Sequence, residues 1–238
     1  EKAGIPGWHY GMLRSAAYAR MLEALPSNIV FAGHKFVRFE TDDDVVTLHF
    51  DNGAQWQADL LIGADGIRSA VAHQVFGDAG LFHCGIQVWL GWCYCDSVPR
   101  DIGYLSHSPT VQASFFPLLH EGREAFEWWL VEPWNEGQPF HGDVKTHIMR
   151  HLEGWTEPLP TLVRATDFER NTFRWEIYNR RPLQQWSHGR VSFLGDAVHP
   201  VSPYAAYGMG MAIEDGYYLA KSLAGTDLAD RDVLAAAV

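Results

Sequence analysis

The stretch Gly189–Pro200 reads GRVSFLGDAVHP, and its pattern decides the fold. A short, mostly apolar run, Val191–Leu194, leads directly into Gly195-Asp196. Earlier in the chain the apolar run Ala58–Gly63 leads in the same way into Ala64-Asp65-Gly66. Near-continuous apolar runs are typical of strands that are covered on both faces in a parallel sheet, and ligands of such sheets bind where the strands end. We therefore predict two strands whose acidic loops converge on one ligand.

Each aspartate also has a simpler interpretation. An Asp beside a Gly is a common turn signal, and its side chain often caps the turn that follows. Asp65 and Asp196 are therefore either ligand contacts or local caps.

Helix and strand patterns surround the two loops. Apolar residues at helical spacing predict a helix over residues 12–25 that ends at Pro26. Strands are predicted over 29–39 and 45–50, followed by a hairpin turn at Asp51–Ala54, where Asn-Gly suits a positive φ. A further helix is predicted over 208–223.

The middle of the chain has a different character. Most of the ten tryptophans lie between residues 82 and 180, in alternating patterns that predict a β-sheet with one helix at 144–152. We therefore predict an α/β fold with an α+β insert. Residues 1–81 and 181–238 form the two parts of one α/β domain, and residues 82–180 form an inserted, mainly β domain.

Composition limits the class of partner. The net charge is −11, from 29 acidic and 18 basic residues, which argues against nucleic acid or an anionic membrane. No apolar run reaches the ~18 residues that would suggest a transmembrane helix. Three cysteines do not make a disulfide framework. We expect a small-molecule partner and a reducing, cytoplasmic setting, and the sequence predicts no oligomeric state.

Two motifs resemble those of FAD-dependent aromatic hydroxylases, the group A flavoprotein monooxygenases with the p-hydroxybenzoate hydroxylase fold. The segment Ile177–Leu183, with Trp186, resembles the salicylate-hydroxylase branch. The family's Asp-Gly motif is matched at Ala64, Asp65, Gly66, Ser69 and Val71. Its second FAD motif is matched at Gly195, Asp196, Ala197, His199, Pro200, Pro203, Gly208, Ala212, Ile213, Glu214 and Asp215.

The resemblance implies a Rossmann-like FAD-binding domain and a role for particular residues. Asp196 would accept a hydrogen bond from a ribityl hydroxyl, and Pro203 would shape the loop beside the flavin. A helix that starts near Gly208 would point its N-terminal amides at the pyrimidine edge, where reduced flavin carries negative charge. No catalytic residue and no metal ligand are predicted. The predicted cofactor-binding residues are Arg14, Asp65, Gly66, Gly195, Asp196, Pro203, Gly208 and Met209.

The resemblance also implies a reaction. NAD(P)H would reduce the bound FAD, O2 would form the flavin C4a-hydroperoxide, and an aromatic or similar electron-rich substrate would be hydroxylated in a site that excludes water. Leu90 and Phe116 stand where the family often has Arg and Tyr, so two polar groups are missing on the substrate side. The family's N-terminal Gly-x-Gly-x-x-Gly motif is not found, so we expect the chain to be a fragment without that unit.

Other interpretations stay open. The chain is alternatively a non-catalytic remnant or interaction module of the same fold, or a hydrolase that uses Asp65, Asp196 and His199 around a metal. His199 is either a general base or, as we favour, a residue that stabilises the loop near FAD.

Two further groups of residues raise the question of a zinc site. His83, Cys84, Cys93 and Cys95 lack the usual paired spacing of zinc ligands, so we expect buried strand cysteines. His147 and His151 lie four residues apart without the glutamate of a His-Glu-x-x-His site, and we expect them to be solvated.

Overall fold

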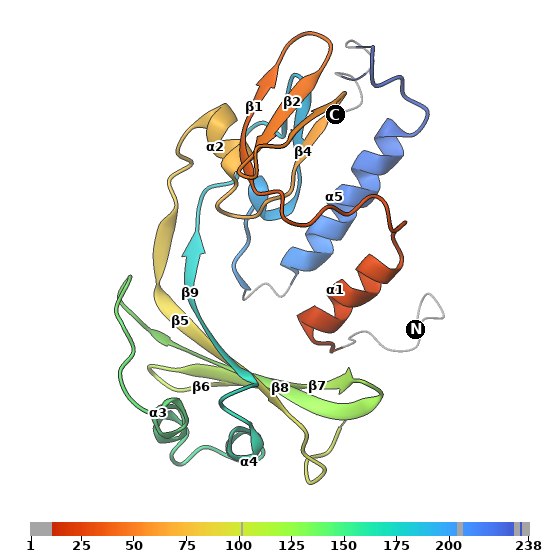
Figure 1. The fold of residues 1–238 in the computed structure, drawn as a ribbon. Coiled ribbons are helices and arrows are strands. Elements are labelled where there is room, and N and C mark those ends of the chain that lie inside the picture. Colours follow the sequence, from red (N-terminus) through yellow and green to blue (C-terminus); the bar gives the residue numbers. More distant parts are fainter. Residues whose placement is uncertain (1–10, 101, 204–206, 231–233, 235–238) are drawn as a thin grey trace. The chain divides into compact units, whose positions relative to one another are not determined.

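The computed structural model describes residues 11–100, 102–203, 207–230 and 234 (Figure 1). The chain divides into two compact units. The first unit combines Glu1–Val30 with Gly85–Ile177, and the second combines Phe31–Cys84 with Tyr178–Val238. The second unit carries both acidic loops.

A five-stranded sheet forms the centre of the first unit. The strand order is β6-β7-β8-β5-β9, and Figure 1 shows helices α3 and α4 together on one side of this sheet. Strands β5 and β9 carry the chain between the two units. The elements are α1 (Arg14–Glu23), β5 (Phe82–Cys93), β6 (Tyr104–His107), β7 (Gln112–His120), β8 (Arg123–Pro133), α3 (Val144–His151), α4 (Leu159–Ala165) and β9 (Thr172–Asn179).

The core of the first unit forms around Trp128, which is fully buried on β8. Trp128 lies opposite Gly91 of β5 in the antiparallel ladder. A Cβ at position 91 would come within 2.3 Å of the indole, so only glycine leaves room for the ring. Ile148 of α3 and Leu162 of α4 belong to the same buried cluster, which fixes both helices on the sheet.

The second unit contains two three-stranded sheets. One is an antiparallel meander of β1 (Phe36–Thr41), β2 (Val46–Phe50) and β3 (Gln55–Ala58). The other has the order β10-β11-β4, from β10 (Ser187–His188), β11 (Val191–Phe193) and β4 (Leu61–Gly63), with β11 and β4 parallel. Its helices are α2 (Ala70–Phe76), the 3-10 turn η1 (Gly195–Ala197) and α5 (Gly208–Leu223).

Several predicted elements are present. Helices α1, α3 and α5 lie where helical spacing predicted them, and Gly53 has a φ of 82° in the predicted hairpin turn. The mixed fold with an inserted sheet is confirmed. The compact units set the inserted block at Gly85–Ile177 and group the described residues up to Val30 with it. The predicted domain segments 1–81, 82–180 and 181–238 stay a prediction.

Three details of the prediction are wrong. The strand expected over 29–39 begins only at Phe36, and Ile29 before it is exposed. Helix α4 was not predicted, and it holds Pro160 in its first turn, where proline is tolerated. Strand β4 is not covered on both faces by the residues that the structure describes, because Ile62 is 42% exposed.

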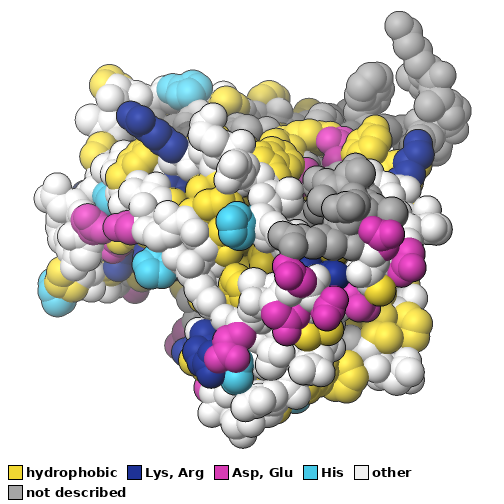
Figure 2. All heavy atoms as spheres, turned by 90° about the horizontal axis from the view of Figure 1, so that it is seen from above, with side chains coloured by type: hydrophobic (Ala, Val, Ile, Leu, Met, Phe, Trp, Pro, Cys, Tyr) yellow, Lys and Arg dark blue, Asp and Glu magenta, His cyan; other side chains and the backbone are white. Residues whose placement is uncertain are grey.

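Two properties of the described residues bear on the predicted class of partner: charge and the apolar character of the helices. Acidic residues outnumber basic ones by 29 to 18, and Figure 2 shows several carboxylate side chains gathered on the face drawn. Among the described residues, no helix combines the length and the apolar character needed to cross a bilayer.

Candidate functional site

The two acidic loops leave the same edge of one sheet. Strands β4 and β11 pair in parallel, with Phe193 opposite Gly63. The pairing continues one step further, because the Leu194 amide donates to the Gly63 carbonyl at 3.0 Å. Asp65 and Asp196 follow directly, so the structure brings together the two loops that the sequence predicted to converge.

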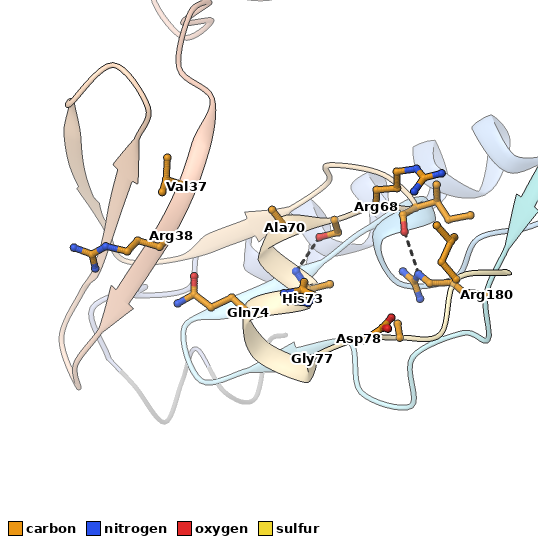
Figure 3. Close-up of a pocket in the computed structure, with 14 residues that line it drawn as sticks. Val37, Arg38, Arg68, Ala70, His73, Gln74, Gly77, Asp78 and Arg180 are labelled. Atoms are coloured by element: carbon orange, nitrogen blue, oxygen red, sulfur yellow. Dashed lines mark hydrogen bonds between the residues drawn. The ribbon is translucent and has the colours of Figure 1, made fainter. Parts of the chain in front are cut away.

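A buried arginine joins these loops. Arg180 is only 4% exposed, and its Nη2 donates to the carbonyls of Asp196 at 2.9 Å and Ala197 at 2.6 Å. Its Nε donates to the Ile67 carbonyl at 3.3 Å, a bond marked in Figure 3. Burial lowers the pKa of Arg180, and the charge of Asp196 opposes this shift. Sequence reasoning quoted Arg180 only as part of a family segment and missed this role.

The carboxylate of Asp65 is used locally. It accepts hydrogen bonds from the Ser69 hydroxyl and from the backbone amides of Ala70, at 2.8 Å, and Val71, at 3.3 Å. These donors lie at the start of α2. The Asp65 side chain therefore caps the turn that follows it, which is the simpler of the two interpretations offered by the sequence. Gly66 follows with a φ of 83°, a conformation that favours glycine. Asp65 and Gly66 therefore shape the first loop.

Asp196 is placed differently. It is exposed, and its carboxylate makes no hydrogen bond to any residue that the structure describes. The preceding Gly195 has a φ of 55°, and a Cβ there would lie 3.0 Å from the Cβ of Ala212 on α5. Glycine therefore allows both the turn and the close approach to α5, and Asp196 is left available as an acceptor.

One carboxylate of α5 holds the second loop in place. Asp215 Oδ2 accepts from the Gly195 amide at 2.8 Å and lies 2.6 Å from His199 Nε2. His199 is buried, and its ring lies 4.8 Å from that of Trp186. This contact agrees with the loop-stabilising role that we favoured for His199.

Helix α5 begins beside this loop. The side chain of its N-cap residue, Tyr207, makes no capping hydrogen bond among the described residues, and the helix starts with Gly208 and Met209. The first amides of an uncapped helix carry partial positive charge and accept polar or anionic ligands. Pro203 is exposed on the segment between η1 and α5. The Asp196 carboxylate could accept a hydrogen bond from the hydroxyl chain of FAD. The first amides of α5, in the same unit, could donate to the polar edge of its ring.

A cavity of about 750 Å³ lies around α2 in the second unit (Figure 3). Its walls include the cationic side chains of Arg38, Arg68 and Arg180. Arg68 also lies over the Tyr178 ring, 4.7 Å from its centroid. None of the predicted cofactor-binding residues lines this cavity.

A second cavity, of about 530 Å³, belongs to the first unit and includes Arg14 of α1. We call it the aromatic cavity. It contains one half-buried carboxyl group, that of Glu127, whose pKa is raised by burial. The sequence showed this glutamate inside the apolar strand pattern FEWWLV, but we did not single it out. The aromatic residues that line the cavity are Tyr18, Trp92, Trp128, Trp129, Phe173 and Trp175, and of these Trp128 has its ring buried in the core.

The alternative metal sites find no support among the residues that the structure describes. No group of three ligand side chains there includes Asp65, Asp196 or His199, or any cysteine. Cys93 is buried, as expected, and burial raises its pKa to about 11. Cys84 is exposed, so the expectation of a buried cysteine is wrong there.

Comparison with known proteins shows the family to which this chain belongs. The profile of the FAD binding domain family matches residues 19–235. The chain belongs to this FAD-binding domain family. The predicted flavoprotein family and its fold class are therefore confirmed.

Curated relatives carry monooxygenase names. Aurachin C monooxygenase/isomerase of Stigmatella aurantiaca is 33% identical over 192 residues, which cover 80% of this chain and 49% of the relative. The 6-hydroxynicotinate 3-monooxygenase of Bordetella bronchiseptica is 28% identical, over 93% of this chain and 60% of the relative. The chain thus spans about half the length of these relatives.

Solved structures show the same fold. Klebsiella pneumoniae HpxO, complexed with FAD and uric acid, superposes with a TM-score of 0.82 at 28% identity, over 94% of this chain and 56% of that one. A salicylate hydroxylase substrate complex superposes with a TM-score of 0.72 at 22% identity, over 91% of this chain and 58% of that one, and shares the fold.

Proposed function

We propose that the full-length protein that carries this chain is an FAD-dependent monooxygenase, which hydroxylates an aromatic or similar electron-rich small molecule with NAD(P)H and O2. The observation that carries this proposal is the joined pair of loops in a member of the FAD-binding domain family. Arg180 fixes both loops, and the exposed carboxylate of Asp196 makes no hydrogen bond to a residue that the structure describes.

Each predicted cofactor-binding residue of the second unit has a physical role in this proposal. Asp196 accepts a hydrogen bond from a ribityl hydroxyl, and the amides of Gly208 and Met209 donate to the polar edge of the ring system. Gly195 allows the close approach of loop and helix, and Pro203 limits the conformations of the segment beside the ring. Asp65 and Gly66 act through the shape of their loop.

FAD, when bound, accepts reducing equivalents from NAD(P)H and activates O2. The chain must orient the substrate and keep water away. We assign the first of these tasks to the aromatic cavity, because its volume of about 530 Å³ lies in the range typical of small-molecule sites. Its indole and phenyl rings suit stacking on an aromatic substrate.

Two side chains give the aromatic cavity chemical selectivity. The Glu127 carboxyl would bind a ring hydroxyl or amine, and burial favours its neutral form, which both donates and accepts a hydrogen bond. Arg14 adds a positive charge at the exposed start of α1 and suits a substrate carboxylate or a cofactor oxygen. A phenolic or heteroaromatic acid meets both requirements.

The test is substrate-dependent oxygen incorporation. Full-length protein, supplied with FAD, is incubated with NADH or NADPH and a panel of hydroxybenzoates and hydroxypyridines under ¹⁸O2. We expect one ring to accelerate NAD(P)H oxidation and to gain one ¹⁸O atom. Glu127→Gln should raise the KM of that substrate, whereas Glu169→Gln, an exposed change elsewhere in the first unit, should leave it unchanged. FAD binding without any labelled product from the panel would count against the proposed substrate class.

A further inference from the structure

Three side chains of the first unit meet at a point that the proposed reaction does not use. Glu132 lies near the end of β8, and His147 and His151 lie one turn apart on α3. One ligand atom from each of the three lies within 4.8 Å of the other two. The sequence interpretation of these histidines as solvated is therefore wrong, because it could not show that a distant strand supplies the acidic partner.

Both imidazoles direct the same nitrogen at the carboxylate. His147 Nε2 lies 2.8 Å from Glu132 Oε1 and 3.0 Å from Oε2, and His151 Nε2 lies 3.0 Å from Oε2. The two rings are 4.8 Å apart and nearly perpendicular. Histidines at positions i and i+4 face the same side of a helix, which is why two turns of α3 present two nitrogens to one carboxylate.

A second layer of hydrogen bonds holds the carboxylate. Oε1 of Glu132 accepts from Gln87 Nε2 at 2.7 Å and from the Trp89 indole at 2.6 Å. The side-chain oxygen of Gln87 in turn accepts from Arg174 Nε at 2.5 Å. Metal-binding carboxylates are commonly oriented by such outer donors. Because these donors occupy Oε1, Oε2 is the oxygen best placed for a metal.

The cluster is accessible from one side only. The Glu132 side chain is 6% exposed, whereas those of His147 and His151 are 20% and 30% exposed. Solvent therefore reaches the buried Glu132 carboxyl group past the two imidazoles.

We propose that Glu132, His147 and His151 bind one zinc ion, with water as the fourth ligand. Two imidazole nitrogens and one carboxylate oxygen form a ligand set typical of zinc, while Mg²⁺ and Ca²⁺ prefer oxygen ligands. Tetrahedral zinc with bonds of about 2.0–2.1 Å separates its ligand atoms by about 3.3 Å. The observed nitrogen–oxygen separation of 3.0 Å is slightly shorter than this, so the imidazoles would move outward to admit the ion.

Zinc at this site would cross-link the sheet to the helix that covers it. Glu132 belongs to β8 and both histidines belong to α3, so the ion would stabilise the first unit against unfolding. Zinc binds the lone pair of each Nε2. A proton on that nitrogen must therefore move to Nδ1 of the same ring or leave for solvent. This site requires neither FAD nor turnover.

The test uses full-length protein without a histidine tag, treated with a chelator and titrated with ZnCl2 by calorimetry. We expect one zinc per chain, a rise in the thermal unfolding temperature, and, with Co²⁺ as the probe, visible d–d bands of a four-coordinate site. His151→Gln should weaken zinc binding at least ~100-fold, since loss of even an outer-shell partner costs about 10–100-fold. This variant leaves Glu132 its bonds to His147, Trp89 and Gln87, and circular dichroism checks that it folds.

His188→Ala, which removes an exposed histidine outside the cluster, should bind zinc like the unaltered protein. Glu132→Gln should lose affinity together with His151→Gln. If the metal-free protein binds no zinc, or if His151→Gln and Glu132→Gln both bind it with unchanged affinity, the cluster is a hydrogen-bonded ion-pair network and the proposal is wrong.

Discussion

Replacing Asp196 with alanine tests the proposed role of the second loop. The carboxylate is exposed and makes no hydrogen bond to a residue that the structure describes, so its removal should cost folding stability only through the lost charge beside the buried Arg180. In the complex with FAD, the same change leaves a ribityl hydroxyl without its acceptor, which costs ~1–3 kcal/mol. At about 1.4 kcal/mol per factor of ten, the FAD dissociation constant should rise about 5- to 150-fold.

The assay is titration of FAD into full-length apoprotein, followed by quenching of flavin fluorescence. Asp59→Ala is the matched control. Asp59 is an exposed aspartate of the same unit that precedes β4, at the opposite end of the strand from Asp65. An unchanged dissociation constant for Asp196→Ala would refute the role of this carboxylate. If Asp59→Ala weakened FAD binding equally, the effect would come from the loss of any negative charge in this unit and not from the Asp196 carboxylate.

Three further changes test the structure around the site. Asp65→Ala removes the acceptor of the Ser69 hydroxyl and the Ala70 amide, so urea unfolding should show a loss of ~1 kcal/mol; unchanged stability would mean that the capping contacts do not matter. Gly195→Ala places a Cβ at a φ of 55° and 3.0 Å from Ala212, so the free energy of unfolding should fall by ~1–3 kcal/mol, and an equally stable variant would contradict the packing. Burial raises the pKa of Glu127, so the ionised carboxylate costs stability as the pH rises above the ordinary carboxyl pKa of 4.5. Glu127→Gln should therefore raise the free energy of unfolding at neutral pH, with the gain vanishing at pH values below 4.5; a gain that is independent of pH would exclude this cause.

The sequence predicted the pairing that matters most for the site. The runs that end in Asp65 and Asp196 are apolar over a few residues and then polar, which is the pattern of buried strands with loops at a ligand-binding edge. The structure pairs the two strands in parallel, although the face of β4 that carries Ile62 is exposed. The use of the Asp65 carboxylate was not settled in advance, because capping and ligand binding require the same residue type beside glycine.

Two side-chain contacts that the sequence did not reveal depend on residues far apart in the chain. Arg180 looked like one of several charges in a linking segment, and only the fold brings it to carbonyls of two loops. Glu132 lies fifteen residues before His147, on a different element, so helical spacing alone could not connect them. The exposed stretch at Ile29 was taken for a strand because it is apolar, although apolar residues also occur on surfaces.

The FAD content of the full-length protein tests the central claim most directly. Protein purified and dialysed after incubation with excess FAD should be yellow, with flavin absorption bands that correspond to about one FAD per chain. A folded protein that stays colourless under these conditions would contradict the assignment of the two joined loops to a flavin site.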